Sequence, residues 1–234
     1  MTQAGTNKAY VTHLYRNYIS VVDLNTRQVS KTIPTPYPNT ECAIPYQNKV
    51  YVSNWDTASS YIYKINTQND SIEKLITLPV RAPHSMALHG NTLWVLAGNP
   101  YKGKASYLLK INLNQDLVQQ VFSFPPNADP IKISTNTTGD SLYFLMVNYG
   151  GTPSMNGLYR MSVNDLNLPT QAWIQAPNGT YFWGYGLHPK TGAVYLSDPK
   201  GFTQQGSILM YNTQGQYQQT LRAGIGTNTF YFIP

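Results

Sequence analysis

Aromatic and cationic side chains occur together in several irregular stretches of the sequence, as in the pair Tyr15-Arg16. Flat rings offer stacking area with little side-chain entropy to lose, and lysine and arginine supply donors that suit an anionic or carbonyl-rich ligand. Aromatic walls with a few placed polar groups are typical of ligand sites. We therefore predict a ligand-binding face, and we assign no catalytic residue, metal ligand or cofactor. The nine residues of this face are Tyr15, Arg16, Trp55, His84, Tyr101, Lys102, Tyr149, Trp183 and Lys200.

The aromatic residues are densest in residues 181–185, where four of the five residues carry rings. A long loop with two adjacent glycines, Asn148–Asn156, lies upstream. These glycines do not resemble a phosphate-binding loop, because no lysine-serine helix start follows them. Such aromatic density fits either packing between repeats or the wall of a site, and the sequence leaves both open.

Acid–base and metal chemistry find weaker support. The histidines lie far apart and without metal-ligand spacing: His13, His84, His89 and His188. The chain has two glutamates, and no paired-carboxylate, nucleophile–base or calcium-loop pattern is present. A catalytic set would have to combine His13 with His84 and a nearby aspartate. Asp56 and Asp129 are the candidates for that aspartate.

The elements that position these residues are short strands. Residues Lys49–His89 contain four of them. Lys49–Asn54 and Tyr61–Ile65 alternate apolar and polar residues, which is the period of a half-buried strand. Ile72–Leu78 and Ser85–Leu88 follow. No segment here carries the three-to-four-residue apolar spacing of a long helix.

Five copies of this pattern cover the chain, at about residues 8–47, 49–89, 92–135, 141–188 and 193–233. One aromatic residue recurs in each copy, at intervals of roughly 40 to 50 residues: Tyr10, Tyr51, Trp94, Tyr143 and Tyr195. A four-stranded sheet cannot bury both its faces alone, whereas sheets stacked around an axis can. We predict an all-β fold, a β-propeller with five four-stranded blades in a single domain spanning residues 1–234.

The two ends of the chain leave two interpretations of the ring. Met1–Asn7 reads as a loop, and Thr229–Ile233 reads as a final strand without a partner. If the two ends complete one blade together, the ring is closed with five blades. If upstream blades precede Met1, the chain is the C-terminal part of a larger ring of about seven blades.

The stretches KAYVTHL, ISVVDLNT, KVYVSNWD and HPKTGAVYLSD resemble the YVTN family of β-propeller repeats. The closing AGIGTNTFYF is similar to the C-terminal end of a group of envelope propellers in that family. The resemblance covers nearly the whole chain, and it implies a propeller at the cell surface or in the periplasm, or a secreted one. Some relatives capture corrinoids for vitamin B12 uptake, but no motif in this sequence carries that ligand over.

Composition points in the same direction. Only 11% of the residues are charged and 19 are tyrosine, which suits a secreted or envelope β-protein better than a cytosolic enzyme. The net charge of +6 arises from a scarcity of acids and not from a basic run, so we expect no nucleic-acid partner. The single cysteine, Cys42, excludes an internal disulfide and a cysteine-based zinc site.

No apolar run approaches the ~18 residues that a membrane-spanning helix needs, and no signal peptide is present. A lipid anchor would require a segment ahead of Met1. The sequence therefore predicts a non-enzymatic binding module of the cell envelope or the extracellular space. It would capture a small molecule, a glycan or a protein partner on the face that carries the aromatic loops. The alternative is a propeller hydrolase or lyase with its active site at the channel mouth.

Overall fold

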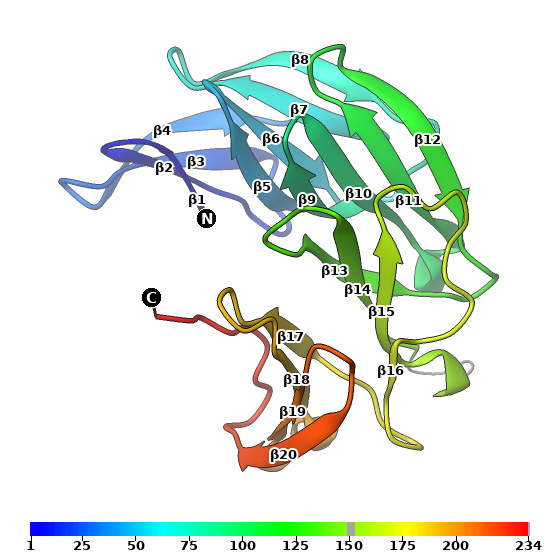
Figure 1. The fold of residues 1–234 in the computed structure, drawn as a ribbon. Helices are drawn as coiled ribbons and strands as arrows, with labels where there is room; N and C mark the ends of the chain where they lie inside the picture. The colour runs from blue at the N-terminus through cyan, green and yellow to red at the C-terminus, as the bar shows by residue number, and fades with distance from the viewer. Residues whose placement is uncertain (149–152, 234) are drawn as a thin grey trace. The chain divides into compact units, whose positions relative to one another are not determined.

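The structure, a computed structural model, describes residues 1–148 and 153–233. Regular structure in these residues consists of β-strands and three short 3₁₀ turns, with no α-helix. The strands form five four-stranded antiparallel sheets, each built from four strands that are consecutive in the chain (Figure 1). The predicted all-β fold with five four-stranded repeats is confirmed.

The first compact unit, Met1–Phe124, holds three of the sheets. The first sheet consists of β1 (Thr2–Gly5), β2 (Lys8–Val11), β3 (Tyr18–Asp23) and β4 (Gln28–Pro34). The second consists of β5 (Thr40–Tyr46), β6 (Lys49–Asn54), β7 (Tyr61–Asn66) and β8 (Ser71–Thr77). The third consists of β9 (Pro83–His89), β10 (Thr92–Asn99), β11 (Lys104–Asn112) and β12 (Leu117–Ser123), with the 3₁₀ turn η1 (Pro100–Lys102) between β10 and β11.

The second compact unit, Pro125–Pro234, holds the other two sheets. The fourth sheet consists of β13 (Pro130–Thr135), β14 (Ser141–Met146), β15 (Gly157–Ser162) and β16 (Ile174–Gln175), with η2 (Pro153–Met155) ahead of β15. The fifth consists of β17 (Gly184–Leu187), β18 (Val194–Asp198), β19 (Ser207–Tyr211) and β20 (Tyr217–Arg222), with η3 (Lys200–Phe202) ahead of β19. That the whole chain is one domain stays a prediction.

The expectation of a loop at the N-terminus is wrong. Thr2–Gly5 is a strand that pairs with β2, and Thr2 lies opposite Tyr10. The stretch TQAG offers little apolar alternation, so this strand depends on its backbone ladder more than on side-chain burial. Patterns of apolar residues do not reveal a strand of this kind.

The expected final strand at Thr229–Ile233 is wrong as well, because these residues join no sheet in the described chain. Phe230 and Phe232 instead direct their rings toward Tyr195 of β18, with ring centres 6.1 and 5.3 Å apart. The alternation that suggested a strand therefore serves side-chain packing against a sheet and not pairing at its edge.

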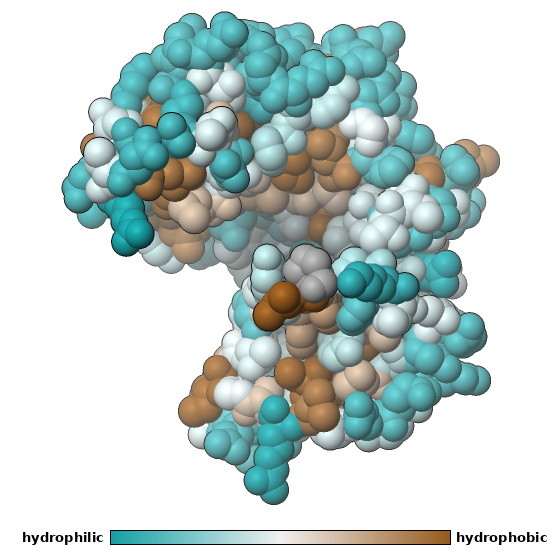
Figure 2. All heavy atoms as spheres, turned by 60° about the vertical axis from the view of Figure 1, so that its left-hand side comes forward, coloured by the Kyte–Doolittle hydropathy of each residue, from teal (hydrophilic) through white to brown (hydrophobic). Residues whose placement is uncertain are grey.

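Burial separates the central strands from the outer ones. Every residue of β14 is buried, whereas every residue of β20 is exposed. The outer strands β4 and β8 also carry polar, exposed side chains, and Figure 2 shows hydrophilic residues along the upper margin where β8 lies. Short outer strands with polar side chains discourage pairing with other chains.

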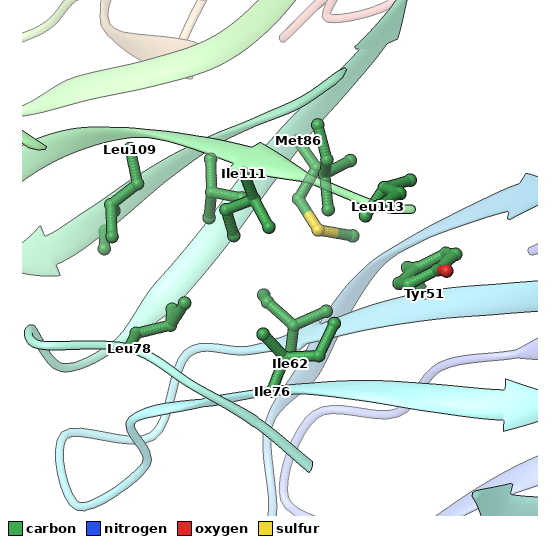
Figure 3. Packing of buried hydrophobic residues seen from close by; sticks show 11 residues of the cluster. Tyr51, Ile62, Ile76, Leu78, Met86, Leu109, Ile111 and Leu113 are labelled. Carbon is green, nitrogen blue, oxygen red and sulfur yellow. The ribbon is translucent and has the colours of Figure 1, made fainter. Parts of the chain in front are cut away.

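Apolar side chains fill the space between neighbouring sheets. In Figure 3, Ile62 and Ile76 of the second sheet face Leu109 and Ile111 of the third. Ile62 and Leu109 are completely buried, and each such side chain contributes roughly 1.5–3 kcal/mol to the hydrophobic free energy of folding. Similar clusters join the first sheet to the second, and the fourth to the fifth.

The recurrent aromatic residue lies on the second strand of each sheet, and Tyr10, Tyr51 and Tyr143 belong to these clusters. In four sheets a lysine or arginine places its charge 5.3–5.9 Å from the ring centre, as Lys64 does above Tyr51 and Lys110 above Trp94. Such a contact contributes about 0.5–1 kcal/mol at a partly exposed site. The regular spacing of these rings is thus explained by packing within the scaffold.

Ion pairs join neighbouring sheets of the first unit at the turns between third and fourth strands. Asp70 of the second sheet accepts a hydrogen bond of 2.7 Å from Lys8 of the first, and another from the hydroxyl of Tyr10. Asp116 of the third sheet pairs with Lys64 of the second at 3.0 Å. These turns therefore contribute to the contact between sheets.

Candidate functional site

In an antiparallel sheet of four consecutive strands, the loop between the second and third strands lies at the same end as the loop that leads to the next sheet. We call this end the loop face of each unit, and the opposite end the turn face. In the first unit the loop face carries Tyr15, Arg16, Trp55, His84, Tyr101 and Lys102, and in the second unit it carries Trp183 and Lys200. The ninth predicted residue, Tyr149, lies outside the described residues.

Asn39 organises the loop face of the first unit. Its side-chain Oδ1 accepts a hydrogen bond of 2.9 Å from the backbone nitrogen of Tyr15, and its carbonyl accepts one of 2.9 Å from the nitrogen of Trp55. Its Nδ2 donates to Asp56 at 3.4 Å. Asn39 and Tyr15 both have positive φ, 65° and 61°, a conformation that asparagine tolerates well. One side chain thus holds two loops from different sheets in place.

Trp55 links the second and third sheets. Its Nε1 donates a hydrogen bond of 3.1 Å to the carbonyl of Gly98, and its ring centre lies 6.1 Å from that of His84. The ring is still 40% exposed, so part of it is available to a ligand. Trp55 therefore has both a structural contact and a free surface.

His84 is buried beside Trp55 on strand β9. Burial lowers the pKa of its imidazole to about 4, so the ring is neutral at pH 7. Within the described chain, no carboxylate pairs with it. A neutral, buried ring of this kind offers apolar surface beside Trp55 and no positive charge.

The remaining predicted residues of the first unit extend into solvent. Tyr15 is 85% exposed and Tyr101, on η1, is 58% exposed. Arg16 and Lys102 are exposed, and neither forms an ion pair with a described residue. The structure thus places Trp55 and His84 together, joins Tyr15 to Trp55 through Asn39, and leaves the two cations at the periphery.

The loop face of the second unit carries a cluster of three aromatic rings and one lysine, which we call the tryptophan cluster. Its members are Tyr181, Trp183, Phe202 and Lys132. Phe202 stands edge-on to Trp183, with ring centres 5.2 Å apart, and lies 6.5 Å from Tyr181. Edge-on aromatic pairs contribute about 0.5–1.5 kcal/mol beyond the area that they bury.

The turn η3 presents Phe202 in a strained backbone. Lys200, Gly201 and Phe202 have successive φ values of 45°, 69° and 62°. The nitrogen of Lys200 donates a hydrogen bond of 2.9 Å to Asp198 Oδ1, which fixes the start of the turn. Non-glycine residues with positive φ are unfavourable and tend to occur where a loop must hold a side chain in place. Lys200 therefore belongs to the site mainly through the turn that it forms, and its side chain is exposed.

Lys132 was not among the predicted site residues. It lies on β13 where the ladder is irregular, because Ile131 pairs with Leu145 but the next pair joins Ser134 to Tyr143. Its φ of 54° turns the chain locally. Bulges of this kind redirect a side chain. A lone lysine in the otherwise uncharged stretch PIKIST is the signal that sequence reasoning could have used.

The ammonium group of Lys132 lies against Trp183, with its nitrogen 5.7 Å from the ring centre, and donates a hydrogen bond of 3.2 Å to the carbonyl of Asn228. Burial lowers its pKa to about 8. Asp129, at the end of the loop ahead of β13, has its pKa raised to about 6, also by burial. Neither group pairs with the other in the described structure.

Within the described chain, the two histidines of the candidate catalytic set have separate partners. His13 bonds to Ser20 at 2.9 Å and packs against Tyr18, while His84 lies beside Trp55. Asp129 belongs to the other unit. No group of three or more histidine, cysteine, aspartate or glutamate side chains with metal-binding geometry is found in the residues that the structure describes.

Comparisons with known proteins identify the fold and leave the family open. No protein-family model matches the sequence, and no curated protein matches it. Among solved structures, the chain is similar to a quinonprotein alcohol dehydrogenase-like protein from Bacteroides thetaiotaomicron, with a TM-score of 0.69 and 14% identity. It is also similar to the hydrazine synthase of Kuenenia stuttgartiensis, with a TM-score of 0.68 and 13% identity.

The first of these alignments covers 95% of this chain but 54% of the solved one, and the second covers 96% and 74%. This chain therefore spans about half the length of the first structure that it matches. Together with the five four-stranded sheets, these likenesses show that the chain has an all-β propeller fold. None of the helical turns among the described residues has the length and apolar character needed to cross a bilayer.

Proposed function

We propose that this propeller is a non-enzymatic binding module that captures a small molecule or a glycan through its loop faces. The observation that carries the proposal is the tryptophan cluster, in which Phe202 stands edge-on to Trp183 and the ammonium group of Lys132 lies over the Trp183 ring. The turn that holds Phe202 is strained and its ring is 39% exposed. Rigid rings with one placed cation suit a flat ligand or the apolar face of a sugar.

The loop face of the first unit supports the same function. Trp55 and Tyr15 are exposed, and Asn39 fixes the loops that carry them. Loops held by a rigid scaffold commonly carry binding residues. The turn face, in contrast, uses its polar residues for contacts between sheets, as Asp70 and Asp116 show.

We further propose that the chain is a member of the YVTN group of propellers and acts at the cell envelope or outside the cell. The repeats KVYVSNWD and HPKTGAVYLSD and the low share of charged residues support this assignment. The module would then meet its ligand in the periplasm or at the cell surface.

A binding screen tests the function. The purified chain would be titrated with a panel of neutral oligosaccharides, flat aromatic acids and a corrinoid, and binding would be followed by calorimetry. We expect at least one class to bind, and Trp183→Ala to weaken that binding by on the order of 1–3 kcal/mol, the range for an interface anchor. Arg27→Ala, on the turn face, is the matched control and should leave the affinity unchanged. If Arg27→Ala lost binding while Trp183→Ala and Trp55→Ala retained it, the site would lie on the turn face and the proposal would be wrong.

A further inference from the structure

Lys132 is a partly buried cation that forms no ion pair with any residue that the structure describes. Every ion pair in the described chain involves other lysines: Lys8, Lys49, Lys64 and Lys74. Lys132 has instead one neutral acceptor, the carbonyl of Asn228, and the face of one ring, Trp183. An ammonium group has three donors, and the Asn228 bond uses one of them. The remaining donors of a half-buried ammonium are strong sites for an oxygen anion.

Two carboxylates belong to the same loop face, and neither satisfies this lysine. The carboxylate of Asp198 accepts a hydrogen bond from the backbone nitrogen of Lys200 and so stabilises the turn η3. Asp129 is itself partly buried, and its carbonyl accepts a hydrogen bond from Val147. A carboxylate that arrives with a ligand would supply the missing partner.

The surroundings of Lys132 specify the rest of the ligand. Lys132 and Phe202 both approach Trp183, with the lysine nitrogen 5.7 Å and the phenylalanine ring centre 5.2 Å from its ring centre. A flat ring placed against Phe202 and the edge of Trp183 would therefore hold a carboxylate on its rim near the ammonium group.

We propose that the tryptophan cluster binds a flat, ring-bearing carboxylate, with Lys132 taking the carboxylate and Phe202 and Trp183 taking the ring. The inference rests on the proposed binding function and names the chemical class of its ligand. The structure thereby assigns to Lys132 the role of the specificity-determining residue of the second unit.

The test uses ¹⁹F NMR titration of the whole chain with 4-fluorobenzoate and, as a neutral probe of the same shape, methyl 4-fluorobenzoate. We expect the acid to bind at least about tenfold more tightly than the ester, which corresponds to one charge-assisted hydrogen bond. Lys132→Met should remove this preference by weakening the acid and leaving the ester unchanged. Lys190→Met, an exposed lysine at the turn face of the same unit, is the matched control and should behave as the native chain.

Equal binding of acid and ester, or an unaltered preference in Lys132→Met, overturns the inference. Lys132→Arg provides a second variant, which keeps the charge and should retain the preference, and circular dichroism verifies that each variant folds. If the ester binds as well as the acid and Trp183→Ala abolishes both, the carboxylate inference falls while the binding function stands. If neither probe binds but a neutral oligosaccharide does, the carboxylate inference is again wrong and the proposed binding function still stands.

Discussion

The backbone nitrogen of Tyr15 donates a hydrogen bond of 2.9 Å to the side chain of Asn39, although the two residues belong to loops of different sheets. The backbone carbonyl of Asn39 also accepts a hydrogen bond from the backbone nitrogen of Trp55. Tyr15 and Trp55, which the sequence predicts on one face without showing what connects them, are therefore both held by Asn39. We expect the arrangement of these two loops to depend on that asparagine.

Replacing Asn39 by glycine tests this dependence. Glycine retains the positive φ of 65° but removes the side-chain bonds to Tyr15 and Asp56. We expect a loss of roughly 1–2 kcal/mol in the free energy of unfolding, and faster hydrogen exchange at Tyr15 and its neighbours. Asn127→Gly, at a position with a φ of 63° in the other unit, is the control. Exchange at Tyr15 that is the same in both variants would contradict the role given to Asn39.

The ion pairs between sheets lead to a second prediction. Asp116 is largely buried and accepts bonds of 3.0 Å from both Lys64 and Lys74. Desolvation raises the pKa of its carboxyl, but the two lysines outweigh this and the net pKa is lowered. Asp116→Asn leaves Lys64 without its anionic partner, so we expect a loss on the order of 1–3 kcal/mol in urea unfolding.

Glu73→Gln is the comparison for Asp116→Asn. The pair of Glu73 with Lys49 lies within one sheet and Glu73 is exposed to solvent, so its removal should lower stability less than the removal of Asp116 does. Equal losses in the two variants would show that Asp116 does not strengthen the contact between sheets.

Sequence patterns predicted the five repeats because each repeat places its apolar residues two apart along strands that are half or fully buried. Tyr51 and Trp94 fit this pattern, since each is buried on the second strand of its own sheet. Sequence patterns do not reveal the contacts of Lys132 and Asp70. Their partners, Asn228 and Lys8, lie 96 and 62 residues away in the chain. Contacts between repeats leave no local pattern.

The errors at the chain ends have the same origin. Thr2–Gly5 forms a strand through its backbone ladder, which leaves no apolar period to detect. Thr229–Ile233 has the right alternation but uses Phe230 and Phe232 to cover Tyr195. Trp55 and Trp183 lie on the loop faces, and their role in binding stays a prediction, whereas the position of Lys132 beside Trp183 depends on a bulge that sequence patterns do not reveal.

His84 gives a prediction for acid conditions. Burial lowers the pKa of its imidazole to about 4, from an ordinary value of 6.5. The unfolded chain therefore takes up a proton near pH 6.5 and the folded chain does not, so stability falls as the pH drops from about 6.5 toward 4, by on the order of 2–3 kcal/mol. His84→Gln should flatten this decline in urea titrations at pH 7 and pH 4.5. His89→Gln, at the exposed end of the same strand, should leave the decline intact.

The contribution of Asp129 to stability should change with pH in the opposite direction to that of His84. Its folded pKa is raised to about 6, so the folded chain holds a proton between pH 4 and 6 that the unfolded chain releases. Its contribution to stability is therefore lost as the pH rises through that range. We expect Asp129→Asn to stabilise the chain by on the order of 1–3 kcal/mol at pH 7 and to have little effect at pH 4. The same gain at both pH values would show that ionisation of Asp129 is not the cause.

The last prediction concerns the segment that supplies the acceptor for Lys132. A Cβ added to Gly184 would lie 2.0 Å from the carbonyl oxygen of Asn228, and that oxygen accepts the Lys132 bond. Because the obstacle is backbone, Gly184→Ala must displace the segment around Asn228 and break that bond. We expect a loss of about 1–3 kcal/mol from overpacking, together with faster hydrogen exchange in residues 226–232 and weaker ligand binding at the tryptophan cluster. Gly224→Ala is the matched control, since a Cβ there meets no atom within 4 Å. Hydrogen exchange in residues 226–232 could instead be unchanged in the Gly184→Ala variant and faster in the Gly224→Ala variant. That result would show that the close approach of Asn228 to β17 does not hold this segment in place.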